Sequence, residues 1–186
     1  MDETPTLVYA DEHYVHANHF LTCAAVPILD PRGSIMGVLD VTGDYNGYHS
    51  HTMALVKMSA RMIENQILND GFRDLMRLHM HPRADLIGTL LEGILAVTPD
   101  GRIVGANRGA LDLLRVSGAA LRKQTLASLF GTSFEALADH ARQDRGPVLL
   151  ATGDGLMLHV SPRFVDRTWD TLSTWIPQRD ERPSDG

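Results

Sequence analysis

Residues 21–43 read LTCAAVPILDPRGSIMGVLDVTG, and this stretch decides the fold of the first part of the chain. Two apolar runs, at residues 21–28 and 34–41, flank the sequence Asp30-Pro31-Arg32-Gly33, whose proline and glycine indicate a tight turn. The pattern predicts an antiparallel β-hairpin with a structural role. Pro27 cannot donate a backbone hydrogen bond, so we expect it at a sheet edge or at a bulge.

A long amphipathic helix is expected over residues 52–80, because apolar side chains recur there at gaps of three and four. At about 1.5 Å per residue it would span about 43 Å. A helix of that length either leads into another domain or pairs with a copy of itself. The alternative is two ordinary helices broken near Asn69-Asp70-Gly71, since glycine weakens a helix by about 1 kcal/mol. Pro82 ends the helical pattern.

A second hairpin is predicted by Thr98-Pro99-Asp100-Gly101, which has the signature of a type I turn between strands at residues 93–97 and 102–106. Asn107 follows, where a helix N-cap belongs. Residues 152–155 predict a third hairpin. The segments expected to be short helices are 108–116, 119–130 and 133–142.

Composition limits the class of protein. The 186 residues allow one large domain or two small ones, and 44% apolar with 22% charged residues favours a folded chain. A single cysteine excludes an internal disulfide and a multi-cysteine metal site. The net charge of -6 argues against a broad nucleic-acid-binding face. No apolar run reaches the length of a membrane span and no signal peptide opens the chain, so we expect a cytoplasmic protein.

Sequence motifs of catalysis are missing. The chain has no phosphate-binding Gly-x-x-x-x-Gly-Lys loop, no Gly-x-Ser-x-Gly elbow and no His-Glu-x-x-His pair. Cys23 lies in an apolar run, which predicts a buried, inert thiol. His159 fits a packing position in a strand better than a catalytic base. We therefore predict no catalytic residues and a sensing or interaction module.

The histidines do not predict a metal site. His13, His16 and His19 are spaced three apart, which on a helix would put them on one side. Neither a helical pattern nor a fourth ligand accompanies them. His49 and His51 fit a loop and a helix cap. No metal ligand is predicted.

The stretch 21–43, followed by Tyr48-His49-Ser50-His51-Thr52 and Ile63-Glu64-Asn65, resembles the C-terminal half of a GAF domain. It is most similar to the sensory regions of sigma-54-dependent transcriptional activators of the acetoin-catabolism-regulator type, over about residues 8–70. In that family an ATPase domain and a helix-turn-helix follow. No positions of this chain match either, so the resemblance implies a truncated sensory region that neither hydrolyses ATP nor binds DNA.

Residues 92–110, EGILAVTPDGRIVGANRGA, resemble the first half of a PAS domain. The two resemblances imply an α+β fold: a partial GAF-like antiparallel sheet, a long connecting helix, and a PAS-like antiparallel sheet with short helices. The expected divisions are a partial GAF-like part at 1–51, the GAF C-terminal and connecting helix at 52–85, a PAS-like domain at 86–165 and a tail at 166–186.

A ligand in a PAS domain commonly lies between the sheet and the short helices, and the resemblance allows flavin or haem there without requiring either. The alternative is a filled core. The candidate lining residues are Ile94, Ala96, Ile103, Leu111, Leu114, Leu126 and Leu129.

Two functions from different classes remain. The first is a signal-sensing input module of a bacterial regulator that binds a small effector or relays a rearrangement of a homodimer. The second is a ligand-free dimerisation or interaction module, with Val56, Ile63 and Ile67 as the dimerisation candidates. A small enzyme is the least supported reading.

Overall fold

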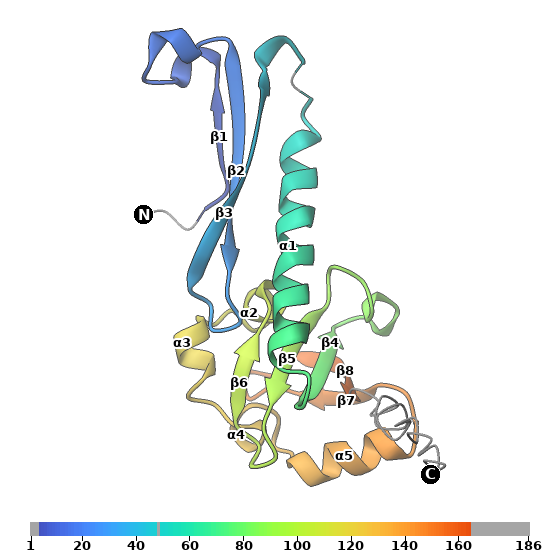
Figure 1. The fold of residues 1–186 in the computed structure, drawn as a ribbon. Helices are drawn as coiled ribbons and strands as arrows, with labels where there is room; N and C mark the ends of the chain where they lie inside the picture. Colours follow the sequence, from blue (N-terminus) through green and yellow to red (C-terminus); the bar gives the residue numbers. More distant parts are fainter. Residues whose placement is uncertain (1–3, 48, 165–186) are drawn as a thin grey trace, which may run out of the picture.

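The computed structural model describes residues 4–47 and 49–164 and contains two antiparallel sheets, with a long helix that runs beside the first sheet and reaches the second at its C-terminal end (Figure 1). The strands of the first sheet are in the order β1-β2-β3, and those of the second are in the order β6-β5-β4-β8-β7. This arrangement confirms the predicted α+β class with antiparallel sheets. The first sheet comprises β1 (Thr6–Tyr9), β2 (Leu21–Leu29) and β3 (Ile35–Asp44).

The hairpin of β2 and β3 forms at the predicted turn. The Asp30 carboxylate accepts the backbone N–H groups of Arg32 and Ser34, each at 2.8 Å, and Gly33 takes a positive φ of 81°. Pro27 lies in the central strand, but β1 pairs with β2 only as far as Ala25. Beyond that point β2 has one neighbour, so the missing N–H of the proline falls where the strand is locally an edge.

Helix α1 (Thr52–Gly71) packs on one face of the first sheet. Its buried residues recur every fourth position, and they are Val56, Ala60, Glu64 and Leu68. Val56 and Ala60 contact Ala24 and Val26 of β2 in one small apolar cluster. The helix ends at Gly71, so the predicted continuation to residue 80 is wrong, and the break lies at the glycine where the alternative placed it.

The residues beyond this break form β4 (Met76–His81), the central strand of the second sheet. The apolar residues Met76, Leu78 and Met80 alternate with polar ones, and all three are buried. Such a period of two fits a strand that faces a core on one side. Pairing with both β5 (Gly93–Val97) and β8 (Met157–Arg163) satisfies the backbone N–H and C=O groups of β4.

The rest of the second unit follows the predicted order. Asn107 caps a helix after the β5–β6 hairpin, as expected. The helix predicted over 119–130 is two short helices, because Thr125 and Ser128 form a capping box that starts a new helix. The elements are β6 (Ile103–Ala106), α2 (Arg108–Leu114), α3 (Gly118–Leu121), α4 (Leu126–Phe130), α5 (Phe134–Arg142) and β7 (Val148–Ala151). Short 3₁₀ turns are η1 (Ala10–Glu12), η2 (His16–Asn18), η3 (Tyr45–Gly47) and η4 (Ala84–Leu86).

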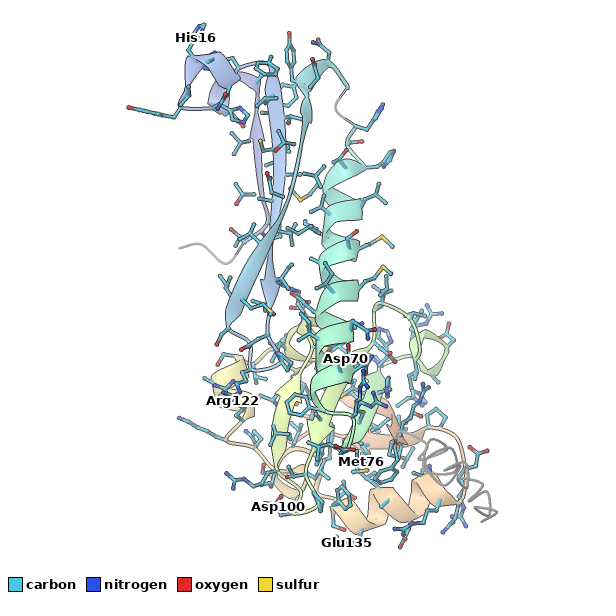
Figure 2. All side chains as sticks on the ribbon, viewed as in Figure 1. His16, Asp70, Met76, Asp100, Arg122 and Glu135 are labelled. Carbon is cyan, nitrogen blue, oxygen red and sulfur yellow. The ribbon has the colours of Figure 1, made fainter. Side chains whose placement is uncertain are left out.

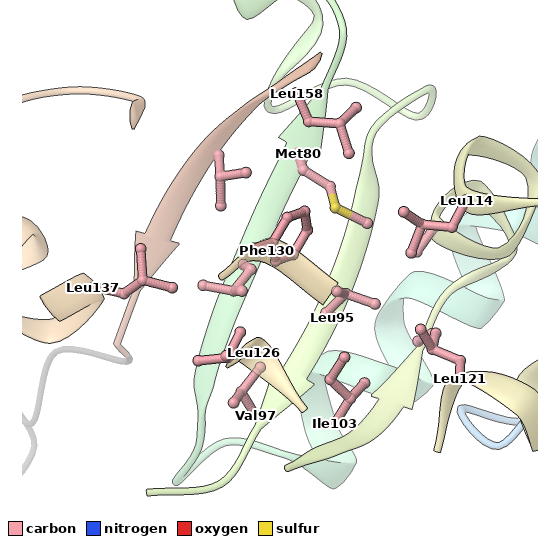
Figure 3. Close-up of a cluster of buried hydrophobic side chains, with 14 of the residues drawn as sticks. Met80, Leu95, Val97, Ile103, Leu114, Leu121, Leu126, Phe130, Leu137 and Leu158 are labelled. Carbon is pink, nitrogen blue, oxygen red and sulfur yellow. The ribbon is translucent and has the colours of Figure 1, made fainter. Parts of the chain in front are cut away.

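The main core lies between one face of the second sheet and the short helices, where Leu95, Ile103, Leu126 and Phe130 converge (Figure 3). The C-terminal end of α1 lies against the opposite face, where the Phe72 ring fills the space beside Gly105. Helix α1 therefore packs on the first sheet and reaches the second at its C-terminal end, where Arg77 of β4 donates to Asn69 at 2.9 Å. None of the helices in the described ranges is both long and apolar enough to cross a membrane. The predicted tail at 166–186, with Trp169 and Trp175, falls outside the described residues.

Candidate functional site: the junction between the two sheets

A buried ion pair joins the two parts of the chain. Glu64 of α1 is 3% exposed, and the Arg108 guanidinium donates to it from Nη2 at 2.8 Å and from Nε at 3.2 Å. The carboxylate also accepts the Leu29 N–H at 2.9 Å, and Arg108 donates to the Pro27 carbonyl at 2.9 Å. Because the pair is so well hydrogen-bonded, β2, α1 and α2 are held together at one point.

Asn107 forms a second connection beside this pair. Its Oδ1 accepts the N–H groups of Ala110 and Ile94, each at 2.8 Å. Asn107 therefore caps α2 and at the same time ties this helix to β5. Its Nδ2 donates to Oδ1 of Asn65 at 2.8 Å and to the Glu92 carbonyl at 3.0 Å. The sequence predicted the cap. The bond to α1 could not be predicted, since Asn65 is distant in sequence.

The tip of the β2–β3 hairpin makes the third connection. The Ala106 N–H donates to the Pro31 carbonyl at 2.8 Å, and Arg122 donates to the Arg32 carbonyl. Figure 2 places Arg122 beside the end of this hairpin. Gly118 lies so close to Arg32 that a Cβ there would overlap the carbonyl. Contacts of this kind mean that the first sheet cannot shift without disturbing the second.

A buried His79–Glu92 pair lies at the start of β5. Nδ1 of His79 lies 3.0 Å from Oε1 of Glu92, a close contact that lacks hydrogen-bond geometry. Burial raises the pKa of Glu92, whereas the interaction with His79 and the hydrogen bond from the Gly88 N–H lower it. The lowering effects together are larger, so the pKa of Glu92 lies below its usual value.

The seven predicted pocket residues do not share one space. Ile103, Leu114 and Leu126 belong to the main core, and Leu111 and Leu129 pack against it. Ile94 and Ala96 are buried but lie outside that cluster, because they alternate along β5 with Leu95 and Val97, which belong to it. The prediction therefore chose the face of β5 that points away from the main core, since Leu95 and Val97 are the residues of this strand in that core.

The predicted dimerisation residues differ in exposure. Val56 is buried against β2, so it is not available to a second copy. Ile67 is half-buried, whereas Ile63 is exposed. The most exposed large apolar side chains of the helix were missed as dimerisation candidates, and they are Leu55, Met58 and Met62. They are three and four positions apart in sequence, and this helical spacing of apolar residues could have indicated them.

Cys23 is half-buried, not fully buried as predicted. Its Sγ is 3.4 Å from Nε2 of His13 and 3.2 Å from Oγ1 of Thr42. The His16 and His19 rings lie 4.4 Å apart in a short turn, not along a helix. Among the described residues, no group of three or more His, Cys, Asp or Glu side chains is arranged to hold a metal ion. His159 pairs with His81 across β8 and β4, in a half-buried strand position.

Comparison with known proteins gives a family match for the first part of the chain. Residues 2–67 match the family model of the GAF domain. The predicted GAF resemblance of the first part of the chain is therefore confirmed.

Two curated relatives are regulatory proteins by name. The signal-transduction and transcriptional-control protein of Clostridium beijerinckii is 27% identical over 111 residues, which are 59% of this chain and 17% of the relative. The acetoin catabolism regulatory protein of Cupriavidus necator is 26% identical over 167 residues, which are 83% of this chain and 25% of the relative. The chain thus spans a quarter or less of the length of these relatives. The matches indicate a signal-sensing regulatory module.

A solved structure is more distant. The crystal structure of the E. coli DhaR(N)–DhaL complex aligns with a TM-score of 0.36 and 13% identity, covering 87% of this chain and 61% of that one.

Proposed function

We propose that this chain is the signal-input module of a bacterial transcriptional regulator, and that it works as a homodimer whose rearrangement carries the signal. The GAF match and the names of the relatives support a sensing role in transcription. The observation that carries the dimer proposal is an apolar stripe on the open face of α1, formed by Leu55, Met58 and Met62.

This α1 stripe lies opposite the buried series of the same helix. Leu55 is 63%, Met58 49% and Met62 57% exposed, although Leu and Met are residues that usually become buried. Apolar residues at this spacing form a seam that a second helix can cover. A second copy of α1 presents the same seam, so a two-fold contact between the helices would be self-complementary.

The junction supports the relay of a signal. The α1 face opposite the stripe carries Glu64, which is bound to Arg108 of α2 and to the backbone of Leu29 in β2. A change in how two α1 helices pack would therefore act on both sheets at once. Helix shifts at a subunit interface are a known route for such transmission.

Sedimentation at several concentrations tests the dimer. We expect the wild-type chain to dimerise and Leu55→Glu and Met62→Glu to be monomeric, since a charge in the seam would have to be buried unpaired. Met157→Glu, which makes the same kind of change at an exposed side chain in β8, should leave the dimer intact. A wild-type chain that is monomeric at all concentrations would refute the proposal.

An effector site is the second candidate, and one hollow supports it. A space of about 210 Å³ is lined by residues that include Leu114 and Leu129, two of the predicted pocket residues, with Thr152 and Leu156. Thermal-shift screening with acetoin and related small metabolites tests it, together with a visible spectrum for flavin or haem. A response that is lost in Leu129→Asp would support this site, and no response to any compound would remove it.

The finer assignments belong to the same proposal. We assign residues 86–165 to a PAS-like domain because the β5–β6 hairpin leads directly into the Asn107-capped helix. The module would act in the cytoplasm, as the input of a sigma-54-dependent system. Its sensing role requires no catalysis.

A further inference from the structure

A hollow of about 220 Å³ opens at the junction, beside the ion pair of Glu64 and Arg108. It draws on both parts of the chain, since its walls come from the start of the first sheet, from α1 and from α2. The residues that line it are Pro5, Val26, Lys57, Arg61, Arg108 and Asp112. Three of these six side chains are cationic and one is anionic.

The positive charge in this junction hollow exceeds the negative charge available to it. Arg61 pairs with Asp112 at 3.0 Å, and Arg108 pairs with Glu64, whose carboxylate is buried and also holds the Leu29 N–H. Lys57 has no ion-pair partner among the described residues. The charges of Lys57 and Arg61 are also four positions apart on α1, a spacing at which like charges destabilise a helix. The chain as a whole has a charge of -6, so its composition does not account for this cluster.

We infer that the junction hollow binds a small anion that carries a carboxylate or phosphate group. Ammonium and guanidinium groups form charge-assisted hydrogen bonds with both. Arg108 donates to its protein partners through Nε and Nη2, which leaves Nη1 without a hydrogen bond in the described part of the chain. The volume lies below the 300–1,000 Å³ of sites for drug-sized ligands, so the anion has few heavy atoms.

Such an anion would contact α1 and α2 together. This inference rests on the proposed sensing function and gives the chemical class of its effector, at a place other than the hollow near Leu129. Binding would add a bridge between the two helices next to Glu64 and Arg108. It would therefore stabilise the junction in the arrangement seen in the structure.

Isothermal titration calorimetry of the full chain with three probes tests the inference. The probes are inorganic phosphate, pyruvate and the uncharged acetoin. We expect phosphate, pyruvate or both to bind, which tells the two anion types apart, and acetoin not to bind at this site. Binding by neither anion would overturn the inference. So would binding of acetoin that Lys57→Gln weakens as strongly as it weakens anion binding, because the hollow would then not select for negative charge.

Two variants with opposite expected effects on anion affinity test whether the anion binds in the hollow. Lys57→Gln should weaken anion binding about tenfold, as expected for the loss of one charged hydrogen bond. Asp112→Asn should strengthen it several-fold, because it removes the carboxylate that repels the ligand. Lys123→Gln is the matched control, since Lys123 is exposed and lies outside the hollow, and it should leave affinity unchanged. Unchanged binding in Lys57→Gln would contradict the site.

The dimer proposal can fail independently of this site. Sedimentation measures the pairing of α1 without any anion, whereas calorimetry measures anion binding at one protein concentration. A monomer that binds phosphate through Lys57 would refute the dimer and support the hollow. A dimer that binds neither anion would support the pairing of α1 and refute the anion site.

Discussion

Glu64 is the residue on which the junction most depends. Glu64→Gln keeps the shape of the side chain but removes the charge that compensates Arg108, a guanidinium only 18% exposed. Removing one partner of a buried pair leaves the other charge uncompensated, so we expect a loss of about 3 kcal/mol in the free energy of unfolding, measured with urea. Asp139→Asn breaks an exposed pair with Arg142 and should cost less than about 1 kcal/mol. Equal losses in the two variants would contradict this account of the junction.

Glu92 gives the protein a defined acid sensitivity. The pKa of Glu92 is lower in the folded protein than the 4.5 of an unperturbed glutamate, so its ionised form favours folding. That contribution is complete above about pH 4.5 and is lost as pH falls through the lower folded pKa. We expect Glu92→Gln to be less stable than wild type at pH 6 and the two unfolding curves to converge toward pH 3. A difference that stays constant across this range would show that the charge is not involved.

At this scale the sequence predicts local roles but not distant partners. Asn107 was predictable as a cap because its partner Ala110 lies three positions away. Its bond to Asn65, like that of Arg108 to Glu64, joins residues more than forty positions apart. Nothing in the local pattern distinguishes these polar residues from solvated ones. Cys23 was misjudged for the same reason, since its neighbour His13 comes from another segment.

At the scale of elements, Gly109 in α2 sets how closely that helix approaches β5. A glycine in a helix is usually improved by alanine, by up to about 1 kcal/mol. Here a Cβ would overlap the Glu92 carbonyl, so Gly109→Ala should instead destabilise the protein by about 1–3 kcal/mol. Gly71→Ala in α1, where a Cβ meets nothing within 4 Å, is the matched control and should be neutral or stabilising. Thermal denaturation of both variants measures the contrast, and stabilisation by Gly109→Ala would contradict the close approach.

The strand β4 shows why some elements were mistaken. Leu75, Met76 and Leu78 extend the three-and-four spacing of the preceding helix, which favoured one long helix. Met76, Leu78 and Met80 also alternate, which is the pattern of a strand. A short apolar run fits both periods, and only the pairing with β5 and β8 decides between them. The three hairpins were predictable because each has its turn residues in sequence between its strands.

At the scale of the whole molecule, the two sheets could be predicted one by one but their assembly could not. The sequence predicted only a tight turn at Pro31 and Arg32. In the structure the carbonyls of both residues accept hydrogen bonds from the second unit. The junction hollow could not be predicted either, because its cationic side chains come from two helices that are distant in sequence. The exposed side of α1 follows from the same assembly, since it is the face that neither sheet covers.

Cysteine cross-linking through α1 tests the central claim of the account most directly, namely that two copies pair along this helix. In a Cys23→Ser background, Met62→Cys places a single thiol on the α1 stripe, and Met157→Cys places one on β8 at similar exposure. Paired helices lie about 8–10 Å apart, so mild oxidation should convert the Met62→Cys chain to a covalent dimer. The Met157→Cys chain should remain mostly uncross-linked. Equal cross-linking of the two variants, or none at Met62→Cys, would contradict the pairing of α1.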